Sequence, residues 1–185
     1  MPFAVEIYMD ADSEAKIRRT WEALARAGIK SSMLEAGYRP HVSLGVCEEL
    51  DINGLAKELS SFAESISPFE LNLSNIGLFP SSEGVIFLGV TPTQRLLDVN
   101  YDFHQFFGKY ARSERQHYHV GNWVPHCTLA FGLPDGIVSE AIEVCRRTPL
   151  PIHSRVEEIG VAEVSPISAR VLCSYDLKGI THAAE

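Results

Sequence analysis

The sequence predicts an α+β protein with two similar lobes, each a mainly antiparallel sheet flanked by helices, and a central cleft between them. Three observations predict this fold class. Segments with helical and strand periodicity follow one another twice in the same order, namely helix, strand, helix, strand, strand. Two of these strands, in equivalent places, carry the related motifs PHVSL and PHCTL. The length of 185 residues fits one two-lobed domain over residues 1–185.

The first half begins with a predicted strand, FAVEIYMD, whose alternate residues are apolar: Phe3, Val5, Ile7 and Met9. A helix is expected from about Ser13, because Asp12 or Ser13 can cap its first turn and Gly28 suits its end. The short strand RPHVSLGV follows. A second helix is expected near Asp51, with apolar residues at helical spacing: Leu55, Leu59, Phe62 and Ile66. FELNLSNIGLF and GVIFLGV are then typical of a hairpin joined by the turn-rich PSSEG.

The second half repeats this order. A helix from about Thr93 to Tyr110 precedes the strand PHCTLAF, and a helix from Asp135 to about Arg146 follows it. Two further strands, at roughly 152–164 and 170–177, are joined by SPIS. The polar stretch SERQHYHVGN is predicted to be a mobile loop. We therefore expect a repeat at the level of lobes, approximately residues 3–90 and 93–177.

The composition restricts the partners. The formal net charge of −8 and the pI of about 5.4 argue against DNA or long RNA, because their backbones need clustered Lys and Arg. A small nucleotide in one positive pocket is compatible with this charge. No apolar run approaches the roughly 20 residues that span a bilayer, and the first residues lack an export signal. We expect a cytoplasmic protein with no membrane partner. The cysteines form no C-x-x-C pair, so reduced thiols are expected.

The two related motifs place polar side chains on strands that are otherwise apolar. Residues i and i+2 of a strand face the same side, so each histidine shares a face with a hydroxyl: His41 with Ser43, and His126 with Thr128. Burying such groups is unfavourable unless they are hydrogen-bonded. If the two lobes pack about a pseudo-twofold axis, the two pairs face each other across one cleft and satisfy one another, water and a ligand.

Two histidines in one cleft are suited to acid–base chemistry. Near neutral pH one imidazole can be neutral and the other protonated, so that one removes a proton while the other protonates a leaving oxygen. Hydroxyl groups beside them can hold the non-bridging oxygens of a phosphate. This set suits in-line displacement on a phosphodiester, particularly a strained cyclic one. The scheme requires neither a metal nor a cofactor.

Paired H-x-[ST] motifs in two α/β lobes resemble the two-histidine (2H) phosphoesterase superfamily, in its 2'-5' RNA ligase (LigT-like) branch. PHVSL, VPHCTLAF and the segment FELNLSNIGLFPSSEGVIFLGV carry the resemblance, which covers about residues 3–177. It implies a bilobal fold and metal-independent cleavage or ligation of 2',5'-linked or 2',3'-cyclic phosphodiesters in a small nucleotide or an RNA end. His41 and His126 would be the acid–base pair, and Ser43 and Thr128 would bind phosphate. Ser43 stands where Thr is commoner.

Two further residues are candidates for the site. Arg39 shares strand parity with His41, so it would contact a phosphate or carboxylate or else form a surface salt bridge. Trp123 precedes the second motif and would stack on a nucleobase or else close the entry to a strand. The approach GNWVPH departs from the arginine-rich, aromatic approach usual in the family, so the base-binding residues are not assigned.

Three alternatives stay open. A non-catalytic nucleotide-binding module could use the same scaffold, and the same site could act as an RNA 2',5'-ligase. A metal hydrolase is the third, with a ligand set drawn from four histidines: His104, His117, His119 and His126. A thiol nucleophile at Cys127 is disfavoured, because strand alternation sends it to the opposite face from His126.

Overall fold

An eight-stranded antiparallel sheet forms the framework of the protein. The structure is a computed structural model, and it describes residues 1–30, 32–80 and 84–179. The strand order is β5-β2-β1-β7-β3-β4-β6, and β8 pairs with β7 outside this path. The strands are β1 (Phe3–Met9), β2 (His41–Leu50), β3 (Phe69–Phe79), β4 (Val85–Val90), β5 (Ala111–Glu114), β6 (His126–Ala130), β7 (Ile152–Ser165) and β8 (Ser168–Asp176).

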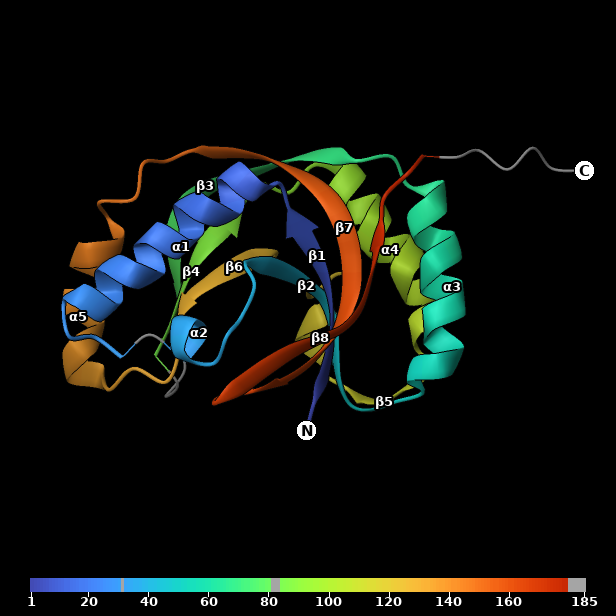
Figure 1. The fold of residues 1–185 in the computed structure, drawn as a ribbon, viewed down its shortest axis with the longest axis horizontal. Coiled ribbons are helices and arrows are strands. Elements are labelled where there is room, and N and C mark those ends of the chain that lie inside the picture. Colours follow the sequence, from blue (N-terminus) through green and yellow to red (C-terminus); the bar gives the residue numbers. More distant parts are fainter. Residues whose placement is uncertain (31, 81–83, 180–185) are drawn as a thin grey trace, which may run out of the picture.

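Helices cover the two halves of this sheet separately (Figure 1). The helices are α1 (Ala11–Arg26), α2 (Ser32–Glu35), α3 (Ile52–Ser65), α4 (Gln94–Phe107), the 3-10 helix η1 (Gln116–Tyr118) and α5 (Asp135–Cys145). α1 packs with α5 and contacts β6, whereas α3 packs with α4 and contacts β7 and β8. The α+β class with an antiparallel sheet flanked by helices is therefore confirmed.

The long strand β7 joins the two halves. Its first residues, from Ile152 to Val156, pair with β3, and its later residues pair with β1 on one side and β8 on the other. The sheet is continuous through β7, and it curves so that β2 and β6 contact each other. Residues 3–90 and 93–177 therefore do not form separate sheets, because β6 pairs with β4 and β7 pairs with both β1 and β3. As a repeat of element order, the two ranges stay a prediction.

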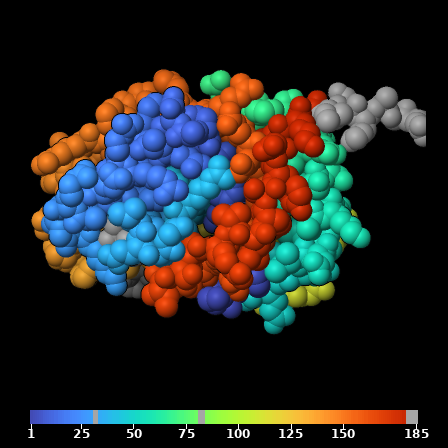
Figure 2. All heavy atoms as spheres, in the orientation of Figure 1, coloured from blue at the N-terminus to red at the C-terminus, as the bar shows by residue number. Residues whose placement is uncertain are grey.

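Apolar side chains on both faces of the sheet build the core. Trp21 on α1 and Phe103 on α4 are fully buried, one under each half of the sheet. Trp21 also satisfies its one polar atom, because Nε1–H donates to the carbonyl of Thr128 at 3.2 Å. Figure 2 shows that α1 and the strands β7 and β8 leave little of β1 on this face of the molecule. A polar side chain on β1 therefore needs partners within the protein.

Most predicted elements are confirmed, with shifts at their ends. α1 begins earlier than expected, and its N-cap is Asp10 rather than Asp12 or Ser13. β2 is longer than a short strand, since it continues to Leu50. The predicted loop SERQHYHVGN contains the end of β5, which pairs with β2, and η1. Residues 81–83 of the predicted PSSEG turn lie outside the described residues. In the part of the chain that the structure describes, no helix is long and apolar enough to cross a membrane.

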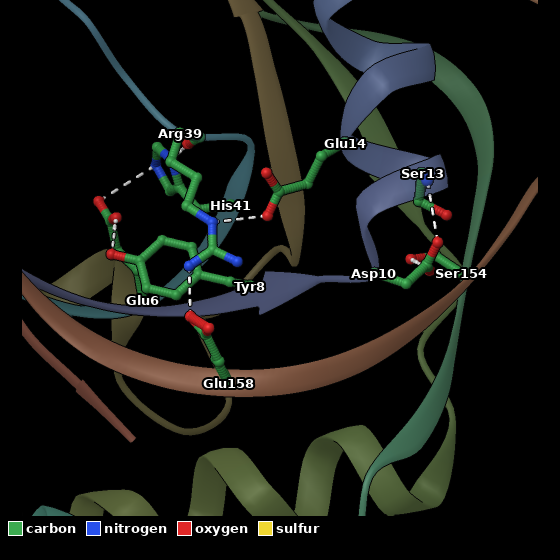
Figure 3. Close-up of polar contacts among 9 residues, drawn as sticks. All are labelled: Glu6, Tyr8, Asp10, Ser13, Glu14, Arg39, His41, Ser154 and Glu158. Carbon is green, nitrogen blue, oxygen red and sulfur yellow. Dashed lines mark hydrogen bonds and ion pairs between the residues drawn. The ribbon is translucent and has the colours of Figure 1, made fainter. Parts of the chain in front are cut away.

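Asp10 ties the start of α1 to β7 (Figure 3). Its carboxylate accepts hydrogen bonds from the backbone N–H of Ser13 at 2.9 Å, the hydroxyl of Ser154 at 3.0 Å and the backbone N–H of Arg155 at 2.8 Å. Burial disfavours ionisation, but these hydrogen bonds outweigh it and lower the pKa of Asp10 to about 2. The ionised carboxylate is therefore the form that holds the helix and the strand together.

We expect Asp10→Ala to lower the free energy of unfolding by about 2 kcal/mol at pH 7, at the upper end for an N-cap because two strand contacts are also lost. Asp51→Ala is the matched control, since Asp51 caps α3 through one exposed hydrogen bond to Gly54. It should cost about 0.5–1 kcal/mol. Because folding lowers the pKa of Asp10, its contribution is complete above the ordinary value of 3.8 and is lost as the pH falls towards 2. Urea unfolding at pH 7 and pH 3 measures both effects, and equal losses for the two variants would contradict the proposed role of Asp10.

Candidate active site

The two motif histidines begin β2 and β6 and are held in the same way. The Nδ1 atom of His41 lies 2.7 Å from the carbonyl oxygen of Arg39, and Nδ1 of His126 lies 2.7 Å from that of Val124. A carbonyl oxygen only accepts hydrogen bonds, so Nδ1 carries the hydrogen in both rings. In the neutral ring, the lone pair is therefore on Nε2. Each ring presents to its surroundings the nitrogen that can accept or donate a proton in catalysis.

A proline precedes each histidine, and it contributes to this arrangement. Pro40 and Pro125 each stand between the histidine and the residue whose carbonyl accepts its hydrogen bond. Proline fixes its own φ and favours an extended conformation of the residue before it. Both features reduce the number of orientations that the accepting carbonyl can adopt. The P-H-x-[ST] motif thus encodes the orientation of the imidazole as well as its position.

Contacts between β2 and β6 bring the two motifs together. β2 contacts β6, and the backbone amide of His41 is close enough to the thiol of Cys127, the residue after His126, to act on its pKa. Trp123 Nε1–H donates to the carbonyl oxygen of Ser43 at 3.0 Å. The charge of His41 also lowers the pKa of His126, an effect that acts only over a short range in a protein. The two imidazoles therefore lie in one region of the molecule.

His126 has aromatic surroundings. Its ring centroid lies 4.9 Å from that of Phe79, edge to face, and 5.2 Å from that of Phe87. Burial lowers the pKa of His126 below 6.5, and the charges of His41 and His117 lower it further, against the opposing hydrogen bond to Val124. The neutral form is therefore favoured at neutral pH. A neutral imidazole with a free Nε2 is suited to accept a proton.

His41 has polar surroundings instead (Figure 3). It is only 7% exposed, and its Nε2 lies 3.3 Å from Oε1 of Glu6, a residue of β1. The other oxygen of Glu6 accepts a hydrogen bond from the hydroxyl of Tyr8 at 2.9 Å. The ring of Tyr38 stacks at 5.8 Å from that of His41. The two histidines thus share one backbone arrangement but differ in the charges beside them.

The hydroxyl groups of the two motifs differ in their surroundings. Ser43 is half-buried, and its side chain lies near the phenol of Tyr118 on η1 and acts to lower the pKa of that phenol against the larger effect of burial. Thr128 is also half-buried, and its hydroxyl makes no hydrogen bond to any of residues 1–30, 32–80 and 84–179. Both hydroxyls lie two residues after a histidine, on the same face of the strand. They can therefore contact the same anion as the imidazoles.

Arg39 adopts the salt-bridge alternative. Its Nε lies 2.6 Å from the carboxylate of Glu14 on α1, and its Nη1 pairs with Glu158 on β7. The guanidinium also lies over the ring of Tyr8, 4.3 Å from its centroid (Figure 3). Two carboxylates and an aromatic face already occupy the guanidinium. The carbonyl of Arg39 holds His41, and Nε and Nη1 of its side chain form ion pairs, whereas a contact of the guanidinium with a phosphate stays a prediction.

Trp123 and Cys127 both pack into the protein. The indole of Trp123 is half-buried against the core and is anchored on Ser43, which favours the strand-entry alternative over base stacking. Cys127 is buried, and this burial raises the pKa of its thiol to about 12. The thiol is therefore protonated at neutral pH and faces the core. It does not have the properties of a nucleophile.

The four histidines of the metal alternative do not come together as a ligand set. His104 Nε2 lies 3.1 Å from the carbonyl of Leu44 and 3.0 Å from that of Tyr118, so it donates to the backbone and connects α4, β2 and η1. His119 pairs with Glu114 at 3.2 Å. Among the residues that the structure describes, no three His, Cys, Asp or Glu side chains are grouped so that they could hold a metal ion.

A groove lies apart from the histidines, between α1, α5 and the start of β7. Its volume is about 540 Å³, and its lining includes three cationic side chains: Lys16, Arg19 and Arg147. None of the six residues that the sequence predicts for the site lines this groove.

Sequence reasoning missed the second layer of the site. Glu6 and Tyr8 alternate with the apolar residues of FAVEIYMD, so they face away from that apolar set. This pattern, an acid and a tyrosine two residues apart on a strand whose other face is apolar, could have indicated that both residues belong to the site. Phe79 and Tyr118 gave no comparable signal, because Phe79 reaches His126, and Tyr118 reaches Ser43, only through the tertiary fold.

Comparison with known proteins gives a family match over most of the chain. The model described as the 2'-5' RNA ligase superfamily matches residues 14–165. A protein of Bacillus cytotoxicus named "Putative phosphoesterase" is 30% identical over 99 residues, which are 52% of this chain and 54% of that protein. A protein of Bacillus mycoides with the same name is 26% identical over an equal span. The matched span is thus about half the length of these relatives.

Solved structures share the fold at lower identity. The chain is similar to E. coli LigT complexed with 3'-AMP, with a TM-score of 0.58 and 20% identity, over 95% of this chain and 96% of that one. A protein of Thermus thermophilus is similar with a TM-score of 0.59 and 17% identity, over 97% and 99% of the two chains. At these identities the similarity establishes the fold.

The charge coupling of the two rings gives a prediction that does not depend on activity. We expect the pKa of His126 to lie below 6.5 and to rise in His41→Gln, because one of the charges that lower it is removed. His153→Gln is the control, since His153 is exposed on β7 and should leave the pKa of His126 unchanged. An NMR titration of the imidazole Hε1 resonances measures this. An equal pKa of His126 in the wild type and in His41→Gln would show that the rings are not neighbours.

Proposed function

The chain belongs to the 2'-5' RNA ligase superfamily, and from this membership and the geometry of the paired histidines we propose that it is a phosphodiesterase that hydrolyses a 2',3'-cyclic or 2',5'-linked phosphodiester. The substrate is a small nucleotide or the end of an RNA. One observation carries the proposal. The two imidazoles are held identically through Nδ1, so that both Nε2 atoms are available, and a hydroxyl follows each at the second residue.

The difference between the surroundings of the two histidines supports different roles for them in the proposed reaction. His126 is the base, because its aromatic surroundings favour the neutral ring. His41 is the acid, because a carboxylate lies beside its Nε2. His126 Nε2 removes a proton from water, and the water oxygen attacks phosphorus. His41 Nε2–H protonates the leaving ribose oxygen as its bond to phosphorus breaks. Hydrolysis of a 2',3'-cyclic substrate gives a nucleoside monophosphate in which one of the two ring oxygens, O2' or O3', has become a hydroxyl.

The hydroxyls of Ser43 and Thr128 bind the non-bridging oxygens of the phosphate in this scheme. Hydrogen bonds and the imidazolium of His41 stabilise the charge that develops around phosphorus in the transition state. Transfer of both protons by histidine leaves no step for which a metal ion is required.

Two observations support a small nucleotide as the substrate. Structures of the similar protein E. coli LigT are described as complexes with 3'-AMP, NADP+ and ATP. The net charge of −8 disfavours long nucleic acids, whose backbones require many cationic contacts. If the hydroxyl of a second RNA end attacks phosphorus in place of water, the same two proton transfers would join a 2',3'-cyclic end to that hydroxyl, which is the ligase alternative. A nucleotide that binds in calorimetry but is never cleaved would instead indicate the non-catalytic module.

We expect His41→Ala and His126→Ala each to lower kcat on a 2',3'-cyclic or 2',5'-linked dinucleotide substrate by about 10²–10⁴-fold, the usual contribution of a general acid or base. His153→Ala is the control, and it should retain wild-type turnover because His153 is exposed on β7. Thermal unfolding of all three variants shows whether they are folded. A folded His41→Ala or His126→Ala with wild-type kcat would reject the mechanism, and loss of activity on adding a chelator would favour a metal hydrolase.

A further inference from the structure

Glu6 is a carboxylate inside the protein, on the face of β1 that carries the site. It is 2% exposed, and it lies opposite Ser43 of β2 and Gly160 of β7 in the two strand ladders. Gly160 has no side chain, and a Cβ there would come 2.9 Å from the ring of Tyr8. The absence of that Cβ leaves room for the Tyr8 ring, whose hydroxyl donates to Glu6.

The two oxygens of Glu6 are not equally satisfied. Oε2 accepts the hydrogen bond from Tyr8. Oε1 lies 3.3 Å from Nε2 of His41 but forms no hydrogen bond there, and it is buried without a hydrogen-bond partner among the described residues. His41 Nε2 and Glu6 Oε1 are therefore close, but the Nε2–H group does not form a hydrogen bond with the carboxylate. The Nε2–H bond therefore stays available to a ligand while the negative charge stays beside the ring.

A buried carboxylate needs a positive charge nearby to be ionised. Burial raises the pKa of Glu6, whereas His41, Tyr8 and Arg39 oppose this effect, and His41 opposes it most. Arg39 already has two carboxylate partners, Glu14 and Glu158. The imidazolium of His41 is therefore the positive charge that compensates the negative charge of Glu6. By the same electrostatics, ionised Glu6 stabilises the imidazolium.

The second histidine has no such partner among the described residues. Phe79 and Phe87 are the ring contacts of His126, and besides burial, positive charge on His41 or His117 lowers its pKa. Other titratable groups also surround the pair formed by Glu6 and His41. They are Tyr8 on β1, Tyr38 and Arg39 before β2, Arg115 and Tyr118 at η1, Cys127 on β6, Glu14 on α1 and Glu158 on β7. Only Glu6 among the described carboxylates forms an ion pair with His41.

We propose that Glu6 is a positioning residue which holds His41 in its protonated form, and that it thereby sets the alkaline limit of turnover. The inference rests on the proposed function and adds to it. The proton on His41 Nε2 goes to the leaving oxygen, and the proton from water goes to His126 Nε2, so the two rings exchange protonation states in one turnover. Glu6 is neither the donor nor the acceptor in these two transfers. Exchange with solvent then restores both rings.

Glu6→Gln tests this role with a side chain of the same size, which can still accept the hydrogen bond from Tyr8. Without the negative charge, the imidazolium of His41 loses its proton at lower pH. We expect the alkaline limb of the kcat profile to move to lower pH by at least about one unit, which is at least roughly a tenfold loss of kcat above that limb. The kcat on the acid side of the optimum and the KM should change little.

Two variants complete the design. Glu163→Gln is the matched control, because Glu163 on β7 pairs with Arg170 and has no contact with His41. Its profile should coincide with that of the wild type. Tyr8→Phe removes the hydrogen bond that favours ionised Glu6, so it should move the alkaline limb in the same direction by less. Thermal unfolding shows whether each variant is folded. An active, folded Glu6→Gln protein with an unmoved alkaline limb would overturn the inference.

A second readout separates this inference from the proposed function. In the substrate-free protein, the NMR titration of the His41 Hε1 resonance reports the same electrostatic pairing without turnover. We expect its midpoint to be at lower pH in Glu6→Gln than in the wild type and in Glu163→Gln. If the wild type cleaves no tested substrate, the proposed function fails, and this titration still decides the role of Glu6. An unmoved midpoint would reject that role.

Discussion

The hydrogen bond from Nδ1 of each motif histidine to the carbonyl two residues earlier is the constraint on which the site depends. It selects the tautomer, and it turns Nε2 of each ring away from the backbone. The same length of 2.7 Å in both motifs shows that one local geometry is used twice. Because a proline stands between donor and acceptor in both copies, the geometry is a property of the short sequence and needs little from the rest of the fold.

The rest of the fold brings the second motif close to the first. β2 and β6 are not neighbours in the strand order, and they meet because the sheet curves along β1, β7, β3 and β4. β7 makes this possible, since one strand pairs with both β1 and β3 along its length. The fold then gives the two rings different surroundings. Phe79 and Phe87 lie beside His126, whereas Glu6 lies beside His41. In the proposed mechanism, these unequal surroundings are what give the two histidines the different roles of acid and base.

The sequence predicts most of the helices and strands, and it predicts that the two motifs have the same local structure, because both depend on local patterns. The spacing in FAVEIYMD and the repeated P-H-x-[ST] motif are examples. It fails where a residue's partner is distant in the chain. Asp10 rather than Ser13 caps α1, because Ser154 and Arg155 of β7 also bind its carboxylate. The side chain of Arg39 is taken by Glu14 and Glu158 for the same kind of reason. The sequence therefore predicts the secondary structure and the two related motifs better than it predicts the contacts between distant residues.

The proposed mechanism requires both imidazoles to contact one anion through Nε2, and a crystal structure with a bound nucleoside 2'-monophosphate would reveal this contact. We expect the phosphate to lie between His41 and His126, with an oxygen about 2.6–3.2 Å from each Nε2. The hydroxyls of Ser43 and Thr128 should contact the same phosphate, and both Nδ1–H hydrogen bonds to the backbone should be retained. A phosphate that contacts only one of the two rings, or that binds only in the groove between α1 and α5, would show that the mechanism is wrong.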